Sequence, residues 1–217
     1  MARPTDMASR QRAASGILFA VSIEADAFER LSREHVETKA AGLTFHEGVV
    51  AGRRVAWCVT GPGREAAARA ARLLIDGHSP RLLVSAGFAG GLVPSMARGS
   101  VARPARSIVA TGGSPLQLAH AADDELTILT VDTIVATAAA KRRLATDSSA
   151  QLVDMETHAV AAVAAAAELP CACIRVVSDD ASQDLPAEVV GLITPQSPLR
   201  RLGAVLGGLG QIGRAHV

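Results

Sequence analysis

Short apolar runs typical of strands alternate along this chain with longer runs rich in Ala and Leu. The predicted strands cover 17–21, 43–50, 54–60, 81–85, 126–131 and 171–177, and the predicted helices cover 26–33, 64–76, 137–144 and 155–168. The clearest helix is 64–76, which is rich in helix-favouring residues and is expected to stop at Gly77. Strands and helices that alternate in this way indicate an α/β fold with a central sheet covered on both faces.

The composition excludes several classes of protein. At 217 residues the chain is long enough for one large α/β domain with a core of its own. It is 49% hydrophobic and 20% charged, as globular proteins are, and its formal net charge is +1. Such a balance gives no electrostatic reason to expect a nucleic acid, a membrane surface or an acidic partner. A small molecule is therefore the expected partner.

The cysteines give no sign of a disulfide framework. Cys58, Cys171 and Cys173 are odd in number and lie within apolar runs, which is typical of buried strand residues in a reducing compartment. The Cys and His residues show no CxxC or HxxxH spacing. We therefore expect no protein-bound metal and no cofactor.

The first sixteen residues are basic and polar, as targeting segments can be. The apolar run that follows is brief, because Glu24 and Asp26 interrupt it, and a signal peptide needs a longer apolar core and a cleavage site. We interpret residues 1–16 as a disordered tail ahead of the first strand. No stretch of the sequence approaches transmembrane length, and we expect a cytoplasmic protein.

A glycine turn after the strand 54–60 matches part of a dinucleotide-binding fingerprint. Gly61-Pro62-Gly63 opens a helix and, with Ala66, fits the pattern GxGxxA. Dinucleotide folds also need an acidic residue at the end of the next strand, and here that strand ends in Ser85-Ala86-Gly87. Pro62 also removes a backbone N–H that a pyrophosphate would use. An NAD-dependent dehydrogenase is a minor alternative, which an NAD-binding assay would test.

Two other segments carry candidate binding residues. Segment 85–92 holds three glycines where its strand is expected to break, at Gly87. Glycines let a backbone approach a ligand closely at a strand end, but an ordinary glycine turn explains the segment nearly as well. Glu156 begins a predicted helix, where a carboxylate can simply favour the helix dipole. His158 points to another helix face, and we assign it a structural role.

The last predicted strand leads into Arg175, Ser178 and Asp179. The arginine lies in an apolar run and needs a partner, because burying an unpaired charge is costly. Asp179 is either a helix cap or a general acid, and the spacing alone favours neither.

Together these segments resemble the nucleoside phosphorylase/nucleosidase superfamily, in particular its methylthioadenosine/adenosylhomocysteine nucleosidases. The run TGPGREAAARAARLLIDGHSPRLLVSAGFAGGL is similar to the turn, helix and GxAGG loop of that family. The run VDMETHAVAAVAAAAELPCACIRVVSDDA is similar to its ribose-binding Met-Glu segment and Arg-x-x-Ser-Asp strand, and FAVSIEADAF to its first strand and early glutamate. DLPAEVVGLITP also looks like hopanoid-associated members, which remove adenine from an adenosyl-lipid intermediate.

The resemblance implies a three-layer α/β fold with a twisted mixed sheet wrapped by helices, a homodimer, and hydrolytic release of adenine from a 5′-substituted adenosine. Cleavage of the glycosidic bond passes through an oxocarbenium-like sugar, and the leaving base needs a proton. The resemblance implies that Asp179 supplies this proton at N7. It also implies that Glu24 orients or deprotonates the attacking water, and that Arg175 holds the Glu24 side of the site.

The same resemblance implies the substrate-binding residues. Glu156 holds the ribose 2′-hydroxyl, Met155 packs under the ribose, and Ser178 orients Asp179. The glycine loop contributes Phe88, Ala89 and Gly90.

Two departures from the family pattern bear on the substrate. Phe88 stands where many relatives have a small hydroxyl residue near the nucleophile, and the interval between Gly91 and Asp154 is short. The main alternative is a phosphorolytic enzyme of the same fold, and a non-catalytic nucleoside-binding module is a further one. Ser85 and Phe88 supply no positive charge for a phosphate dianion, which favours water as the nucleophile.

The predicted catalytic domain covers 17–210 and is expected to be truncated in its final helix. Residues 211–217 are predicted to be a non-native tail. The segment 212–217 is encoded by the DNA string ATCGGAAGAGCACACGTC, which resembles a sequencing-library adapter.

Overall fold

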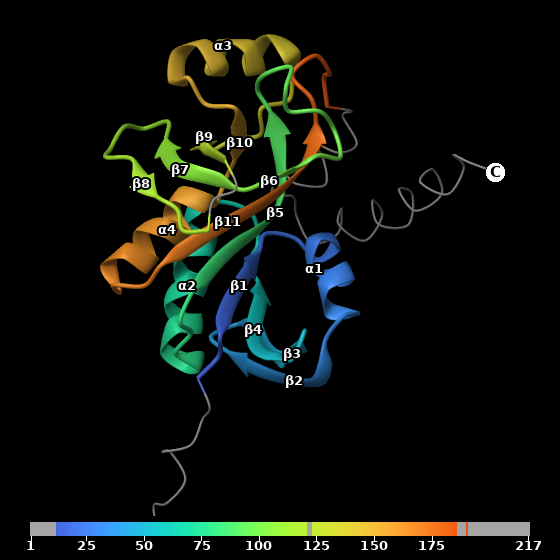
Figure 1. Cartoon of the computed structure of the whole chain (residues 1–217), viewed down its shortest axis with the longest axis vertical. Coiled ribbons are helices and arrows are strands. Elements are labelled where there is room, and N and C mark those ends of the chain that lie inside the picture. The colour runs from blue at the N-terminus through green and yellow to red at the C-terminus, as the bar shows by residue number, and fades with distance from the viewer. Residues whose placement is uncertain (1–11, 121–122, 186–189, 191–217) are drawn as a thin grey trace, which may run out of the picture.

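A computed structural model describes residues 12–120, 123–185 and 190. The strands form one mixed sheet in the order β2-β3-β4-β1-β5-β10-β9-β7-β8, with β11 paired to β5 and β6 (Figure 1). The strands are β1 (Ser15–Phe19), β2 (Arg33–Ala40), β3 (Leu43–Val50), β4 (Arg53–Val59), β5 (Leu83–Gly91), β6 (Val101–Ala102), β7 (Pro104–Val109), β8 (Leu116–Gln117), β9 (Asp123–Thr130), β10 (Leu152–Asp154) and β11 (Cys171–Asp179). The helices are α1 (Ser22–Glu29), α2 (Arg64–His78), α3 (Ala138–Ser148) and α4 (Thr157–Ala166).

The helices form layers on both faces of the sheet, which confirms the predicted α/β fold. α2 and α4 lie side by side against one face, and α1 covers the other face (Figure 1). α3 packs near β9 and β10, where Leu144 and Ala145 contact the apolar cluster around Leu129 and Val153. In the described residues, no helix is long and apolar enough to span a membrane.

Helix α2 shows why this sequence forms its elements. Its buried residues Ala67, Ala70, Ala71 and Leu74 recur at the spacing of one helix face, and that face packs on the sheet. The predicted stop at Gly77 is wrong, because the helix runs through this glycine to His78. It ends where Ser79 adopts a left-handed conformation, with φ of 44°.

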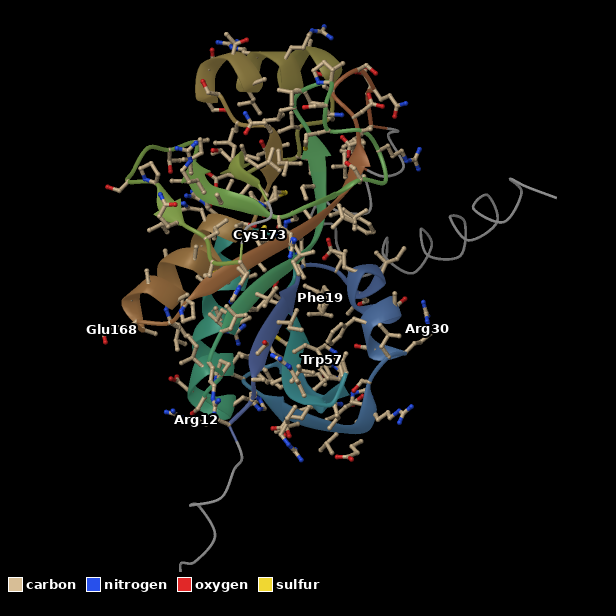
Figure 2. The ribbon with its side chains drawn as sticks, in the orientation of Figure 1. Arg12, Phe19, Arg30, Trp57, Glu168 and Cys173 are labelled. Atoms are coloured by element: carbon tan, nitrogen blue, oxygen red, sulfur yellow. The ribbon has the colours of Figure 1, made fainter. Side chains whose placement is uncertain are left out.

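The layer between the sheet and α1 is aromatic. Phe28 of α1 lies between Phe19 of β1, with ring centroids 5.7 Å apart, and Trp57 of β4, 5.4 Å away edge-on. Figure 2 shows Phe19 and Trp57 on the side of the sheet that faces α1. This packing sets the position of α1 above the end of β1.

Several element boundaries differ from the predictions. Strand 43–50 is confirmed, but the break predicted at Gly87 is wrong, because β5 continues to Gly91. We did not predict β2, whose eight residues are all exposed and show no apolar alternation. β1 begins at Ser15, inside the segment predicted as a tail, and the predictions for 191–217 lie outside the described residues.

Candidate active site

The predicted site residues gather at one edge of the sheet. β1, β4, β5 and β11 are parallel, so their carboxyl ends lie at the same edge. Glu24 follows β1, the glycine turn 60–63 follows β4, and Asp179 ends β11 opposite Gly90 of β5. Open α/β sheets bind their ligands at this edge.

Glu24, in the first turn of α1, lies against the glycine segment of β5. Its Oε2 accepts hydrogen bonds from the backbone N–H groups of Ala20 at 2.8 Å and Val21 at 3.0 Å. Its Oε1 accepts a hydrogen bond from the backbone N–H of Phe88 at 2.7 Å. Three backbone donors thus hold this carboxylate, and the Phe88 ring, 41% exposed, plays no part in holding it.

Two glycines of β5 make room for carboxylates. Gly87 has φ of 149°, and a Cβ placed on it would lie 2.3 Å from Oε1 of Glu24. A Cβ on Gly90 would lie 3.3 Å from Oδ2 of Asp179. The segment is therefore more than an ordinary turn, because each glycine lets a candidate catalytic carboxylate lie directly against the strand.

Glu156 connects the start of α4 to the glycine turn after β4. Its Oε1 accepts a hydrogen bond from the N–H of Gly63 at 2.7 Å, and its Oε2 accepts one from the N–H of Met155 at 3.3 Å. It occupies the N-cap position of α4 but makes no capping hydrogen bond with its side chain. Burial and, second to it, the negative charge of Asp154 raise the pKa of Glu156 from 4.5 to about 7. The turn that resembles a dinucleotide fingerprint thus binds a carboxylate of the protein itself.

Arg175 is paired within the protein. Its Nη2 donates to Oδ2 of Asp154 at 2.6 Å, Oγ of Ser85 at 2.7 Å and Oγ1 of Thr157 at 2.8 Å. Asp154 also accepts hydrogen bonds from Oγ1 of Thr130 at 2.7 Å and from the N–H of Thr157 at 2.9 Å. The guanidinium is 2% exposed, and its Nε has no partner among the described residues. Arg175 has the partner that its apolar strand required, but these hydrogen bonds do not go to Glu24.

Asp179 is buried, with 7% of its surface exposed, and both carboxylate oxygens are engaged. Oδ1 accepts a hydrogen bond from Oγ of Ser178 at 2.5 Å, and Oδ2 lies 2.5 Å from Nζ of Lys141. Ser178 Oγ also lies 3.2 Å from the carbonyl oxygen of Ala89 in β5. Residues 180–185 form no helix, so Asp179 is not the cap of a following helix within the described residues.

The structure thus brings together Glu24, Glu156 and Asp179 with the predicted binding residues. Met155 is partly buried against the cluster of Leu92 and Leu129. Two important residues, Asp154 and Lys141, were not predicted from the sequence. Asp154 had one signal, namely the need of Arg175 for a buried counter-charge. Lys141 had none, because it lies in a helix with basic neighbours that are exposed.

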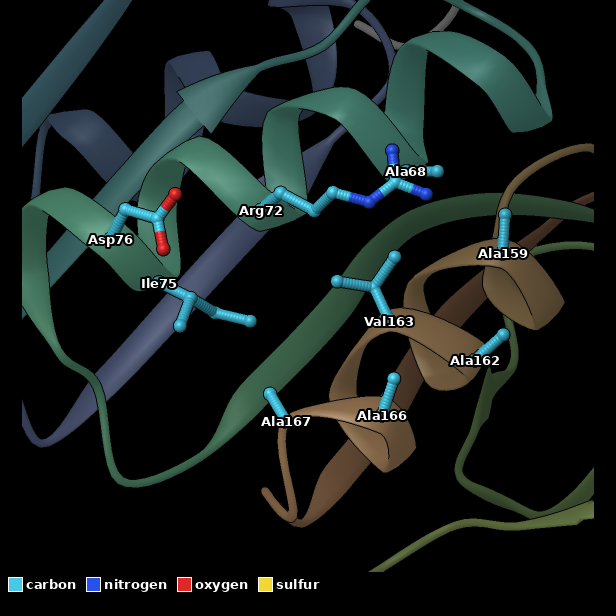
Figure 3. Close-up of a pocket in the computed structure, with 9 residues that line it drawn as sticks. All are labelled: Ala68, Arg72, Ile75, Asp76, Ala159, Ala162, Val163, Ala166 and Ala167. Atoms are coloured by element: carbon cyan, nitrogen blue, oxygen red, sulfur yellow. The ribbon is translucent and has the colours of Figure 1, made fainter.

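Two other features lie outside this edge. A groove of about 470 Å³ between α2 and α4 is lined mostly by alanines, with none of the predicted site residues (Figure 3). His35, Glu37 and His46 of β2 and β3 lie close enough to share a metal ion. However, Nε2 of His35 and Nδ1 of His46 are 2.8 Å apart, which also fits a hydrogen bond between the rings. The absence of a metal stays a prediction.

Relatives of known structure share this fold. A 5′-methylthioadenosine/S-adenosylhomocysteine nucleosidase from Colwellia psychrerythraea, in complex with adenine, superposes with a TM-score of 0.72 at 22% identity, over 93% of this chain and 96% of that one. A mutant nucleosidase from Helicobacter pylori, with 5′-methylthioadenosine in its active site, superposes with a TM-score of 0.70 at 20% identity, over 78% of this chain and 87% of that one. A futalosine hydrolase mutant from Helicobacter pylori superposes with a TM-score of 0.70 at 18% identity, over 89% of this chain and 98% of that one.

Sequence comparison identifies the family. A 5′-methylthioadenosine/S-adenosylhomocysteine nucleosidase from Pseudoalteromonas translucida is 34% identical over 86 residues, which are 40% of this chain and 37% of that protein. The family model of the phosphorylase superfamily matches residues 15–126 and 124–194. This match covers most of the chain, and the observed fold agrees with it. The chain therefore belongs to the phosphorylase superfamily.

Proposed function

We propose that this chain is a nucleosidase that hydrolyses the N-glycosidic bond of a 5′-substituted adenosine and releases adenine. The observation that carries the proposal is the convergence of three hydrogen-bonded carboxyl groups, Glu24, Glu156 and Asp179, at one edge of the sheet. Membership of the phosphorylase superfamily supports it. Bound 5′-methylthioadenosine and adenine in two relatives indicate the class of substrate.

Asp179 is the proposed general acid. The departing adenine carries away the electrons of the glycosidic bond, and a proton delivered to N7 stabilises it. General acid assistance of this kind contributes about 10²–10⁴-fold to the rate. Ser178 donates a hydrogen bond to Oδ1 of Asp179 at 2.5 Å, so the acid is oriented before the substrate binds.

Glu156 and Met155 are the proposed ribose-binding residues. A carboxylate that accepts the ribose 2′-hydroxyl hydrogen bond interacts more strongly as positive charge develops on the sugar. Glu156 is ionised only above its pKa of about 7, so this contact gains strength in neutral and alkaline solution. Met155 offers an apolar surface beside it, under the ribose.

Glu24 is the proposed partner of the attacking water. Its Oε1 carries one backbone hydrogen bond and Oε2 carries two, which leaves acceptor capacity on Oε1. A water bound there can lose a proton to the carboxylate as it attacks the sugar.

The charges near this edge favour water over phosphate. A phosphorylase must hold a dianion with cationic or N–H groups. Arg175 is paired with Asp154 at 2.6 Å, and Arg64, which follows the glycine turn, is paired with Asp132 at 2.6 Å. Both cations are thus neutralised by carboxylates. Phosphorolysis remains the second candidate, because Nε of Arg175 still offers a donor.

The cellular setting belongs to the same proposal. We infer a cytoplasmic homodimer that acts on a small nucleoside in nucleoside catabolism, such as methionine salvage, and that binds neither nucleic acid nor membranes. The support is family analogy together with the net charge of +1. Size-exclusion chromatography with light scattering tests the dimer: a monomer at micromolar concentration would contradict it.

A substrate panel tests the activity. Adenine release is measured from methylthioadenosine, adenosylhomocysteine, futalosine and adenosylhopane, with Asp179→Asn as the inactive variant. Asp180→Asn is the matched control, because the Asp180 side chain accepts hydrogen bonds from Ser182 and, among the described residues, from none of the predicted site residues. We expect release of the base from at least one substrate by the wild type and by the control. A wild type that binds these nucleosides without turnover would favour a binding module instead.

A further inference from the structure

Lys141 is a buried cation in α3 for which the reaction above has no catalytic role. Its side chain is fully buried, whereas the neighbouring Arg142 and Arg143 are exposed. Nζ lies 2.5 Å from Oδ2 of Asp179 and donates to the carbonyl oxygens of Asp180 at 2.7 Å and Gln183 at 2.8 Å. The three ammonium protons therefore have three acceptors, all on β11 or the segment directly after it.

A buried ion pair of this kind is a weak source of stability. Removing a lysine from water is costly, and the attraction of its partner roughly offsets that cost. Two apolar side chains of similar volume in place of the pair would fill this space about as stably, whereas the loss of Lys141 alone leaves Asp179 buried without its counter-charge. The position of Lys141 is therefore better explained by its effect on Asp179 than by its contribution to folding.

We propose that Lys141 is the positioning residue of the general acid, an inference that rests on the proposed nucleosidase function. It holds the Asp179 carboxyl from the side opposite Ser178, so that both oxygens are placed before substrate binds. Asp179 takes up the proton to be delivered from solvent before the step, and Lys141 offsets the negative charge that returns to the carboxyl when this proton passes to N7 of the leaving adenine. No bond to Lys141 forms or breaks in this step.

The chain after β11 supports this role. The N–H of Ala138 donates to Oδ1 of Asp184 at 2.7 Å, and the N–H of Leu185 donates to the carbonyl oxygen of Ala136 at 2.7 Å. Together with Lys141, these bonds attach the segment 180–185 to the start of α3. The helix thus acts as the support that holds the end of β11, and Asp179 with it, against β5.

Two variants separate positioning from simple structure. Lys141→Met removes the charge at similar length, and Lys141→Gln removes it but keeps donors for the carbonyl oxygens. Arg142→Met on the same helix is the matched control. We expect each Lys141 variant to lower kcat about tenfold or more, part of the 10²–10⁴-fold that a general acid contributes, with KM within about threefold. Arg142→Met should leave both constants unchanged.

The decisive comparison repeats Lys141→Met and Lys141→Gln in an Asp179→Asn background. If Lys141 acts through Asp179, either change should cost less than about twofold there, because the effects of residues that act as a unit are not additive. Far-ultraviolet circular dichroism shows whether each Lys141 variant folds. If one of them does not, the comparison is made with the other. Full additivity, or normal kcat in a folded Lys141 variant, would overturn the inference while leaving the nucleosidase proposal intact. An inactive wild type would overturn both.

Discussion

Glu156→Gln tests the electrostatics of the site most sharply. Burial, followed by the charge of Asp154, raises the pKa of Glu156 from 4.5 to about 7. Each unit of difference between the folded and unfolded pKa corresponds to about 1.4 kcal/mol, so the shift corresponds to about 3 kcal/mol. Glutamine keeps the size and polarity of the side chain but removes its charge.

The sign of the effect follows from the raised pKa. Below pH 4.5 the carboxyl is protonated in both the folded and the unfolded chain. Between pH 4.5 and about 7 the unfolded chain loses this proton while the folded chain keeps it. The free energy of unfolding therefore falls as pH rises through this window, by up to about 3 kcal/mol, and stays at the lower level above it.

Urea unfolding of the wild type and of Glu156→Gln at several pH values from 4.5 to 8 measures this component. Because other groups titrate in the same range, the informative quantity is the difference between the two proteins at each pH. We expect the wild type to lose stability relative to the variant as pH rises. If the free energies of unfolding of the two proteins changed with pH in parallel, Glu156 would not be a buried carboxyl with a raised pKa.

Kinetics give a second readout of the same group. If the ionised carboxyl holds the 2′-hydroxyl, wild-type kcat/KM should rise with pH through about 7, the free-enzyme pKa of Glu156. In Glu156→Gln, kcat/KM should not rise with pH in this range. Its kcat should fall by a larger factor than its KM rises, because the lost contact is strongest in the transition state. A change in KM alone would mean that Glu156 binds only the ground-state ribose.

Three further variants probe the rest of the site. Asp179→Asn should lose about 10²-fold or more in activity with an unchanged circular dichroism spectrum, and activity within a few-fold of wild type would remove Asp179 from the chemistry. Asp154→Asn should lower the free energy of urea unfolding by about 3–5 kcal/mol, because it leaves Arg175 buried without its counter-charge, and a neutral effect would contradict that pairing. Gly87→Ala should displace Glu24 and lower kcat, whereas Gly77→Ala, which meets open space in α2, should leave kcat unchanged.

Local patterns in the sequence predicted much of the fold, whereas the family resemblance, more than local signal, pointed to Glu24 and Glu156 as carboxylates of the candidate site. Alternating apolar runs predicted the parallel core strands, and polar residues at the end of an apolar strand marked Ser178 and Asp179. The edge strand β2 escaped prediction because it buries neither face. β10 escaped because it has only three residues, too few to show a period.

The contacts that hold the site join residues far apart in the sequence, which local patterns do not encode. Lys141 of α3 reaches Asp179 at the end of β11, and its own helix gives no sign of this contact. The N–H of Gly63 reaches Glu156 across 93 positions. The glycine turn therefore has a use that its pattern alone did not reveal, namely to hold a carboxylate of the protein.

The most direct test of the proposed hydrolysis follows the oxygen that enters the sugar. The preferred substrate of the panel is incubated with the enzyme in ¹⁸O-labelled water, with and without phosphate, and the sugar product is analysed by mass spectrometry. We predict that adenine release is independent of phosphate and that one ¹⁸O atom enters at the anomeric carbon of a free sugar. Release that requires phosphate and yields an unlabelled sugar 1-phosphate would contradict the account and would make Arg175 the expected anion contact.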